Sequence, residues 1–277
     1  MMDNLLSVVL YPTIVFVLAA VIFIVLDTQQ QMKCNPGQKW YENKDLKLDI
    51  LYLVINTFLK KYMMIFVAII IWSILLPIFD PKSMSIYVQR SMGPLGKFPF
   101  YQQVIIYLIV SDFSMYWLHR LFHHQKLWRY HAVHHSEKQV DWTTAYRFHP
   151  VNIMLSPVLT DVVMLNLGIT PEVMFFLRPF DAAYSFFVHA NLSWTLGYIK
   201  YIMATPVFHR WHHASNIEAM SKNFAPTFAF WDVLFGTFYM PENKLPEEYG
   251  INDANYPQDL IHQLIYPFKR RNRSTIS

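Results

Sequence analysis

Long apolar runs recur along the first two thirds of the chain, separated by polar segments. Residues 7–26, 62–79 and 101–118 are each close to the length at which a helix crosses the hydrocarbon core of a membrane, about 30 Å. A fourth apolar region, 151–196, is long enough for two passes or a hairpin. The pattern predicts an all-α fold, a multi-pass transmembrane helical bundle with about four to five spans.

The polar and proline positions around these runs refine the prediction. Residues 48–61 end in Lys60 and Lys61, and we expect them to lie along the membrane interface ahead of the second span. Proline interrupts helical hydrogen bonding, so Pro171 and Pro179 are expected to break the fourth apolar region.

The first apolar run, 7–26, has an alternative interpretation as a cleaved signal peptide. The preceding "MMDNLL" lacks the basic residues of such a peptide, and no small-residue cleavage motif follows the run. These two features favour a membrane span.

Positive charge predicts the orientation of the bundle. The loop 27–47 carries four lysines, and "KRRNR" occupies residues 269–273. Lysine and arginine collect on the cytoplasmic side of membrane proteins. With both segments on that side, the third span ends in the cytoplasm at His119, and a hairpin returns the chain there before His209. The two histidine-rich segments are therefore expected on the cytoplasmic face, in a helical cap.

Composition agrees with a membrane protein and excludes several other classes. Apolar residues make up 54% of the chain, and charged residues only 15%. The net charge of +4 is not gathered into stripes, so no nucleic-acid partner is expected. The single cysteine, Cys34, rules out a zinc finger, and no glycine-rich nucleotide-binding motif is present.

Histidine is concentrated in two short segments, 119–135 and 209–213. The spacing HxxxH occurs once and HxxHH twice, and on a helix residues i, i+3 and i+4 share one face. The histidines with these spacings are His119, His123, His131, His134, His135, His209, His212 and His213. A zinc ion takes four ligands and an iron ion about six, so this number of imidazoles fits two metals better than one.

The residue type leaves the metal open, since imidazole suits zinc, copper, iron and nickel. Histidine-only ligation at the end of a membrane bundle indicates redox chemistry on an apolar substrate. Haem binding and metal transport are alternatives, but both would place the histidines inside the apolar spans. Here the histidines stand at the ends of the spans.

The motifs "HRLFH", "HAVHHS" and "HRWHH" resemble the three histidine boxes of the fatty acid hydroxylase/sterol desaturase superfamily. The words "DFSMYWLHR", "RFHP" and "WDVLFGTFYMP" strengthen a resemblance that covers roughly residues 101–268. The resemblance implies a catalytic domain over 101–268. It is preceded by an N-terminal membrane region with two transmembrane helices, 1–100, and followed by a basic cytoplasmic tail, 269–277.

The family resemblance also implies an activity, a membrane-bound oxidoreductase that uses O₂ to hydroxylate or desaturate a lipid taken from the bilayer. It implies two iron ions, with zinc as an alternative in a purified form. Without a flavin or nucleotide motif, the external electron donor is expected to be a separate protein or a small reductant. Ether-lipid cleavage, and a non-catalytic metal- or lipid-binding role, are the alternatives.

Carried onto this chain, the resemblance implies the eight histidines above as metal ligands and His189 as a ninth. His149 and His124 are further candidates, as ligands or as neighbours of the ligands. Asp112 lies seven residues before His119 and is expected to bond a ligand histidine or an arginine. Asn191 is expected to orient His189.

Overall fold

The structure is a computed structural model that describes residues 14, 17–26, 33–75, 82–83, 86–87, 90–253 and 255–269. The start of the expected span 7–26, the end of the expected span 62–79 and almost all of the tail 269–277 lie outside the described residues. The described residues form helices, and the β structure among them is an isolated bridge between Ala214 and Tyr249. The all-α prediction is confirmed.

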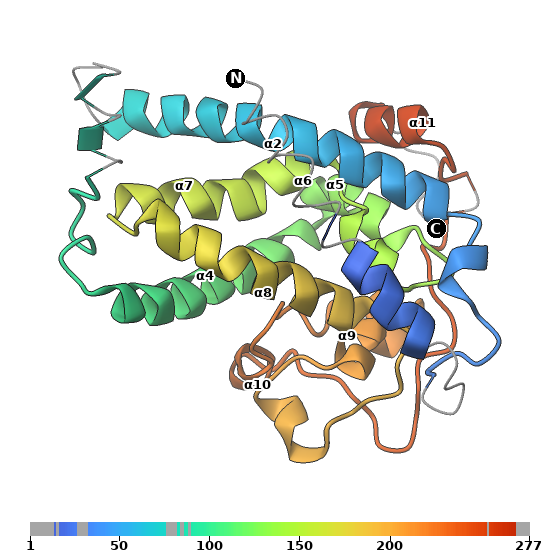
Figure 1. Cartoon of the computed structure of the whole chain (residues 1–277). Helices are drawn as coiled ribbons and strands as arrows, with labels where there is room; N and C mark the ends of the chain where they lie inside the picture. Colours follow the sequence, from blue (N-terminus) through green and yellow to red (C-terminus); the bar gives the residue numbers. More distant parts are fainter. Residues whose placement is uncertain are drawn as a thin grey trace.

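Long helical rods lie side by side and carry a cap of short helices at one end (Figure 1). The rods are α2 (Leu46–Leu75), α4 (Phe100–Phe122), the run α6 (Pro150–Ile153), η4 (Met154–Val158) and α7 (Leu159–Asn166), and α8 (Pro171–His189). The cap contains α5 (Gln125–His135), α9 (Pro206–His213), α10 (Phe230–Leu234) and α11 (Leu260–Ile265), with short 3-10 turns η2 (Trp40–Glu42), η3 (Trp142–Tyr146), η5 (Gly197–Tyr201), η6 (Ile217–Ala219) and η7 (Tyr266–Phe268). Because the chain reverses between successive rods, both histidine-rich segments reach the same end.

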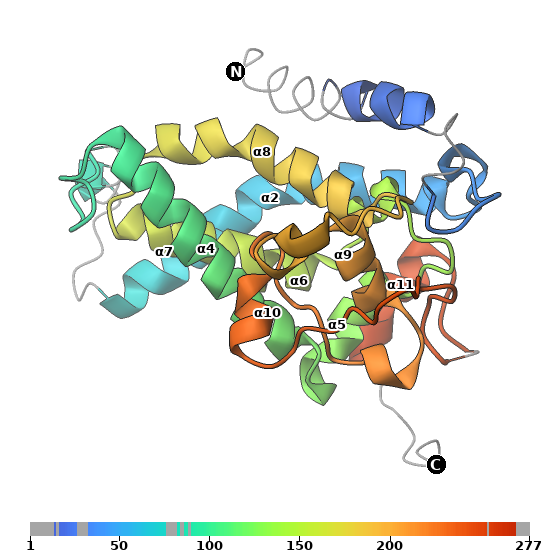
Figure 2. The ribbon, with the colours of Figure 1, turned by 90° about the horizontal axis from the view of Figure 1, so that it is seen from below.

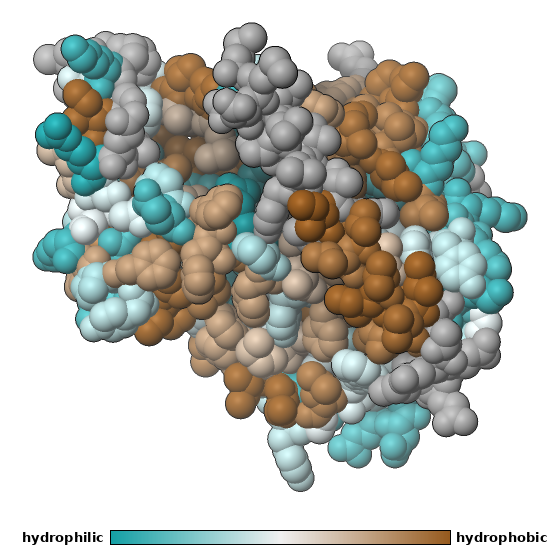
Figure 3. Space-filling view, viewed as in Figure 1, coloured by the Kyte–Doolittle hydropathy of each residue, from teal (hydrophilic) through white to brown (hydrophobic). Residues whose placement is uncertain are grey.

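Two of the described helices are long and apolar enough to cross a membrane, Leu46–Ile74 and Phe100–Phe122. Val17–Leu26 and Pro150–Asn166 are shorter apolar helices. Apolar residues cover much of the face formed by the bundle (Figure 3). Phe175 and Phe176 on α8, for example, are 71% and 60% exposed. This surface is the kind that lipid covers.

The expected division of residues 48–79 into an interfacial stretch and a span is wrong. Residues 46–75 contain neither glycine nor proline, and they form the one continuous helix α2. At 1.5 Å per residue α2 is about 45 Å long, which exceeds the hydrocarbon core of a bilayer. Its first turns therefore continue into the cap, where Asp49 accepts a hydrogen bond from Arg147 (2.7 Å).

The fourth apolar region forms the expected hairpin, with the expected break just before Pro171, but the break expected at Pro179 is absent. Pro171 begins α8 at a position where its missing N–H costs nothing, and Pro179 lies inside α8 without ending it. The chain turns at Gly168, which has φ +97°. A Cβ atom at Gly168 would lie 2.7 Å from the carbonyl oxygen of Gly93, so the turn packs directly on the preceding loop.

Buried side chains join the rods to the cap. Tyr116 on α4, Val188 on α8 and Phe208 on α9 belong to one core cluster, and each is at most 2% exposed. The Tyr116 hydroxyl and the Thr237 hydroxyl are 2.8 Å apart. The cap therefore packs directly against the ends of the rods.

We expect Gly168→Ala to destabilise the protein more than Gly37→Ala. Both glycines have positive φ, but a Cβ atom at Gly37 would meet nothing within 4 Å. The difference isolates the clash with Gly93 and should reach at least about 1 kcal/mol, or a melting temperature lower by about 2–4 °C. Thermal unfolding in detergent measures both variants, and equal melting temperatures would contradict the packing role of Gly168.

Candidate metal centre

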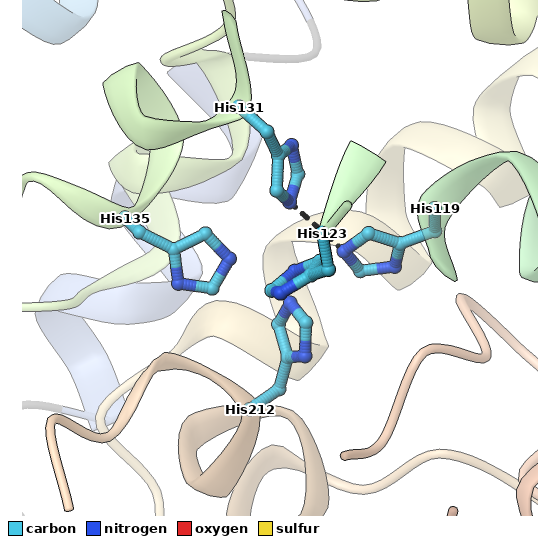
Figure 4. A group of neighbouring side chains, drawn as sticks. All are labelled: His119, His123, His131, His135 and His212. Carbon is cyan, nitrogen blue, oxygen red and sulfur yellow. Dashed lines mark hydrogen bonds between the residues drawn. The ribbon is translucent and has the colours of Figure 1, made fainter. Parts of the chain in front are cut away.

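Nine histidines meet at the capped end of the bundle in two adjoining groups. The first group contains His119, His123, His131, His135 and His212, and the second contains His134, His189, His209 and His213. Within each group, the potential ligand atoms lie within 4.8 Å of one another. In the first group the rings converge on a common point from α4 and its C-terminal end, α5 and α9 (Figure 4).

Each HxxHH motif divides its histidines between the two groups. On α5, His131 and His135 belong to the first group and His134 to the second. On α9 the division is reversed, with His209 and His213 in the second group and His212 in the first. The reason is helical geometry, since residues i and i+4 lie nearly one turn apart while i+3 is rotated to the side.

Main-chain and amide oxygens fix the orientation of five of these rings. Each of these rings donates from Nδ1 to one oxygen. The pairs are His119 to Phe224 O (2.7 Å), His131 to Asn152 Oδ1 (2.7 Å), His134 to Arg147 O (3.2 Å), His189 to Ser185 O (2.6 Å) and His212 to Lys222 O (2.7 Å). A carbonyl oxygen only accepts, so the proton must stand on Nδ1. The Nε2 atom of each ring is then a bare acceptor, the form that binds a metal.

These bare Nε2 atoms face one another at short range. The Nε2 atoms of His119 and His131 are 3.0 Å apart, and those of His134 and His189 are 3.2 Å apart. Two lone pairs at this distance repel unless a proton or a metal ion lies between or beside them. Burial, reinforced by neighbouring imidazoles, holds the pKa of His131 and His134 well below the usual range, so a proton is disfavoured. The donor set fits metal cations.

Three Nε2 atoms of the first group have no hydrogen-bond partner at all among the described residues. They belong to His123, His135 and His212, and all are buried. A buried polar atom left unpaired costs free energy. A metal ion bound by the first group would give each of these atoms a partner.

A buried charged network supports the second group. Arg147 is 1% exposed and donates from Nε to Asp49 (2.7 Å), and its Nε lies 3.8 Å from Glu137. Burial, and then the nearby Asp49 carboxylate, raises the pKa of Glu137 to about 8. The network fixes Arg147, whose carbonyl oxygen accepts from His134. Arg147 is thus buried among carboxylates.

Sequence reasoning missed the supporting roles of Glu137 and Asn152. Asn152 is a polar residue inside an apolar run, and Glu137 stands two residues after the second motif. The position of Asn152 is unusual for a polar side chain, whereas Glu137 belongs to the polar stretch "SEKQ" and gives no such signal. Neither position reveals its distant partner, since Asn152 and His131 are 21 residues apart.

Two of the expected supporting residues act elsewhere. Among the residues that the structure describes, Asp112 forms its hydrogen bonds with neither a histidine nor an arginine. It accepts hydrogen bonds from the backbone of Thr227 (3.0 Å) and Phe228 (3.1 Å) and from the indole of Trp231 (3.0 Å). Asn191 pairs with the backbone of Asn35 in both directions, at 2.8 and 2.9 Å, and so fixes the N-terminal loop.

Two of the expected candidate ligands stand outside both groups. His149 Nδ1 accepts from the backbone of Val151 and Nε2 donates to Leu264 O, both at 3.1 Å, so both nitrogens are occupied. His124 is exposed and caps the start of α5. The structure brings His189 into the second group.

Together these features define a helical protein with membrane-length helices and a histidine-rich centre that fits metal. Residues 104–237 match the fatty acid hydroxylase family model. This segment contains all nine histidines of the two groups. This part of the chain, a little under half of its length, is therefore similar to the fatty acid hydroxylase family.

Several relatives share this part of the chain. Ornithine lipid hydroxylase OlsE of Rhizobium tropici is 30% identical over 65% of this chain and 54% of its own length. Human alkylglycerol monooxygenase is 34% identical over 48% of this chain and 30% of its own length. Methylsterol monooxygenase 2-2 of Arabidopsis thaliana is 28% identical over 54% of this chain and 59% of its own length. The chain thus covers less than two thirds of each relative, and no solved structure matches it.

We expect two double variants to remove metal from one group each. His131→Ala with His135→Ala takes two ligands from the first group, and His209→Ala with His213→Ala takes two from the second. Each purified variant should lose about one metal ion per chain, because the other ligand set stays complete. Elemental analysis measures the content. His262→Ala is the control, since that side chain is 60% exposed and pairs with Asp259. Unchanged metal content in both double variants would contradict the assignment.

The Asn152 amide should strengthen metal binding by orienting His131. We expect Asn152→Ala to weaken metal affinity by about 10–100-fold, while Asn152→Asp, which keeps the acceptor, stays closer to the unaltered protein. Competition with a chelator measures both. Equal affinities for the two variants would show that the acceptor at residue 152 has no such role.

Proposed function

We propose that this protein is a membrane-bound di-iron oxidoreductase that uses O₂ to hydroxylate or desaturate a lipid. The observation that carries the proposal is the pair of adjoining all-imidazole groups at the end of apolar, membrane-length helices. Neutral imidazoles suit iron, and the position brings the centre next to the acyl region of a bilayer. The names of the relatives, which describe lipid hydroxylation and monooxygenation, support the same chemistry.

The nine histidines are the proposed ligands of the two iron ions, which would supply the activation of O₂ and the oxidation of a C–H bond. The protein's own contribution is to hold the rings and exclude water. Every one of these ligands except His119 and His123 is at most 5% exposed. The Nδ1 contacts keep the rings from turning, and Phe148 stacks on His134 with ring centroids 4.0 Å apart. In this proposal no other side chain has to act as a catalytic acid or base.

The membrane arrangement is part of the same proposal. We propose a multi-pass protein whose histidine centre faces the cytoplasm, with residues 101–268 as the catalytic domain. The lipid substrate enters from the bilayer beside the rods, and electrons come from a separate protein or a small reductant. The lysines at 33, 39, 44 and 47 support this orientation, since Asn43 and Asp45 in the same stretch contact Glu137 and Arg147 of the cap.

Ether-lipid cleavage is a second candidate activity. The observation that favours it is the 34% identity to human alkylglycerol monooxygenase over 48% of this chain. This reaction would use the same metals and differs in the carbon that is oxidised. Lipid analysis distinguishes it, because oxidation of the carbon beside the ether oxygen would break the C–O bond and replace the ether lipid by a long-chain aldehyde and the released alcohol, in place of an intact hydroxylated or desaturated lipid.

We expect cells that contain the protein to accumulate lipids heavier by one oxygen atom, or lighter by two hydrogen atoms. His134→Ala should reduce the product at least about 100-fold, since losing a ligand costs more than losing a partner of a ligand. Comparative lipid mass spectrometry measures this, with His262→Ala as the matched control. If the His134→Ala cells made the same product as the control, the proposed function would be wrong.

A further inference from the structure

The segment that follows the third histidine motif, residues 224–235, is packed against the interior of α4. The Asp112 carboxylate binds the backbone of Thr227 and Phe228 and the indole of Trp231. The rings of Phe113 and Trp231 also touch, with centroids 4.9 Å apart. Figure 2 shows α10 beside the end of α4 that reaches the cap.

These contacts set the depth of the segment relative to the membrane. Asp112 lies six residues before Leu118, the last residue of the apolar run that ends at His119 of the histidine centre. At 1.5 Å per residue this is about 9 Å inside the end of that run. A segment packed sideways against Asp112 and Phe113 must lie at their depth, so it cannot stand wholly outside a membrane that α4 crosses.

The backbone of the segment is equipped for such a place. Residues 224–229 precede α10 and are non-helical, and unpaired N–H groups are very unfavourable in lipid. Two buried carboxylates bind these N–H groups. Asp232 accepts from Phe224 and Ala225, each at 2.8 Å, and Asp112 accepts from the next pair. Asp232 is the one charged residue between 224 and 237, and it is 0% exposed.

The outer face of the segment is apolar. Val233 is 47% exposed and Leu234 is 66% exposed. This face continues the exposed apolar surface of α4, where Phe113 is 37% and Trp117 is 42% exposed. The ring of Phe235 lies between the two elements, with its centroid 5.0 Å from that of Trp117.

We propose that residues 224–235 form a re-entrant segment that inserts into the bilayer beside α4, held there by Asp112. Its outer face contacts lipid acyl chains, and its polar backbone is satisfied by the two aspartates. The inference rests on α4 crossing the membrane, which the proposed function shares, and it is independent of the reaction catalysed. The segment thereby forms part of the wall that separates bilayer lipid from the histidine centre.

The test uses spin labels in the full-length protein in lipid nanodiscs. Cys34 is the one cysteine, so Cys34→Ser allows a single label to be placed at Leu234→Cys, at Val233→Cys or, as the control, at Lys244→Cys in an exposed polar loop. We expect labels at 233 and 234 to collide several-fold more with O₂, relative to a water-soluble nickel complex, than the label at 244. Nickel accessibility at both sites equal to that at 244 would overturn the proposal.

Asp112→Asn tests the anchor separately, because the amide keeps one acceptor oxygen while its nitrogen cannot accept, so part of the set formed by the Thr227 and Phe228 N–H groups and the Trp231 indole loses its acceptor. In the Leu234→Cys background we expect this change to raise nickel accessibility toward that of the control label. If the change instead leaves the label as it was, Asp112 does not hold the segment in the membrane. The labels in the otherwise unaltered protein decide the insertion even if this variant fails to fold. If the otherwise unaltered protein shows the insertion but oxidises no lipid, the result counts against the proposed function alone.

Discussion

The main physical constraint on the structure is that buried imidazole rings face one another with their lone pairs, which repel. Carbonyl and amide oxygens hold the protons on the outer nitrogens, so the inner nitrogens of His119, His131, His134 and His189 have no proton to share. Such an arrangement is unfavourable by itself, and cations relieve it. The chain must therefore be held together by other contacts strongly enough to keep the rings facing inward.

Those contacts come from the rods that reach into the cap. The first turns of α2 supply Asp49 to Arg147, and Asn56 on the same helix donates to Phe148 O (2.9 Å). Phe148 in turn stacks on His134. A helix long and apolar enough to cross a membrane thus sets the position of a ring in the histidine centre, so the bundle and the centre form one structural unit.

The sequence predicts the helices and the histidines well because both are local signals. Apolar runs identify the rods, and the spacing of the motifs, with the words around them, identifies the histidines that the structure brings together. His189 has no motif spacing of its own and was found through the family resemblance alone. The continuity of α2 was missed because Lys60 and Lys61 look like the end of a polar stretch, although no helix-breaking residue separates them from the span.

The partners of Asp112 and His131 could not be predicted, because they depend on how distant segments pack. Asp112 binds backbone N–H groups 115 and 116 residues later, and a backbone N–H group carries no sequence signal. The main-chain carbonyl oxygens that orient the histidines also carry no sequence signal, because every residue has one. Sequence thus reveals which side chains are unusual, and the packing reveals what they bind.

The division of each HxxHH motif between two groups has an evolutionary consequence. Because α5 and α9 each contribute to both groups, neither helix belongs to a single metal site that could be lost, copied or transferred alone. A descendant with only one site would still have to keep both helices and both motifs. The second site would then disappear through single substitutions at scattered positions, while the motifs stayed recognisable in the sequence.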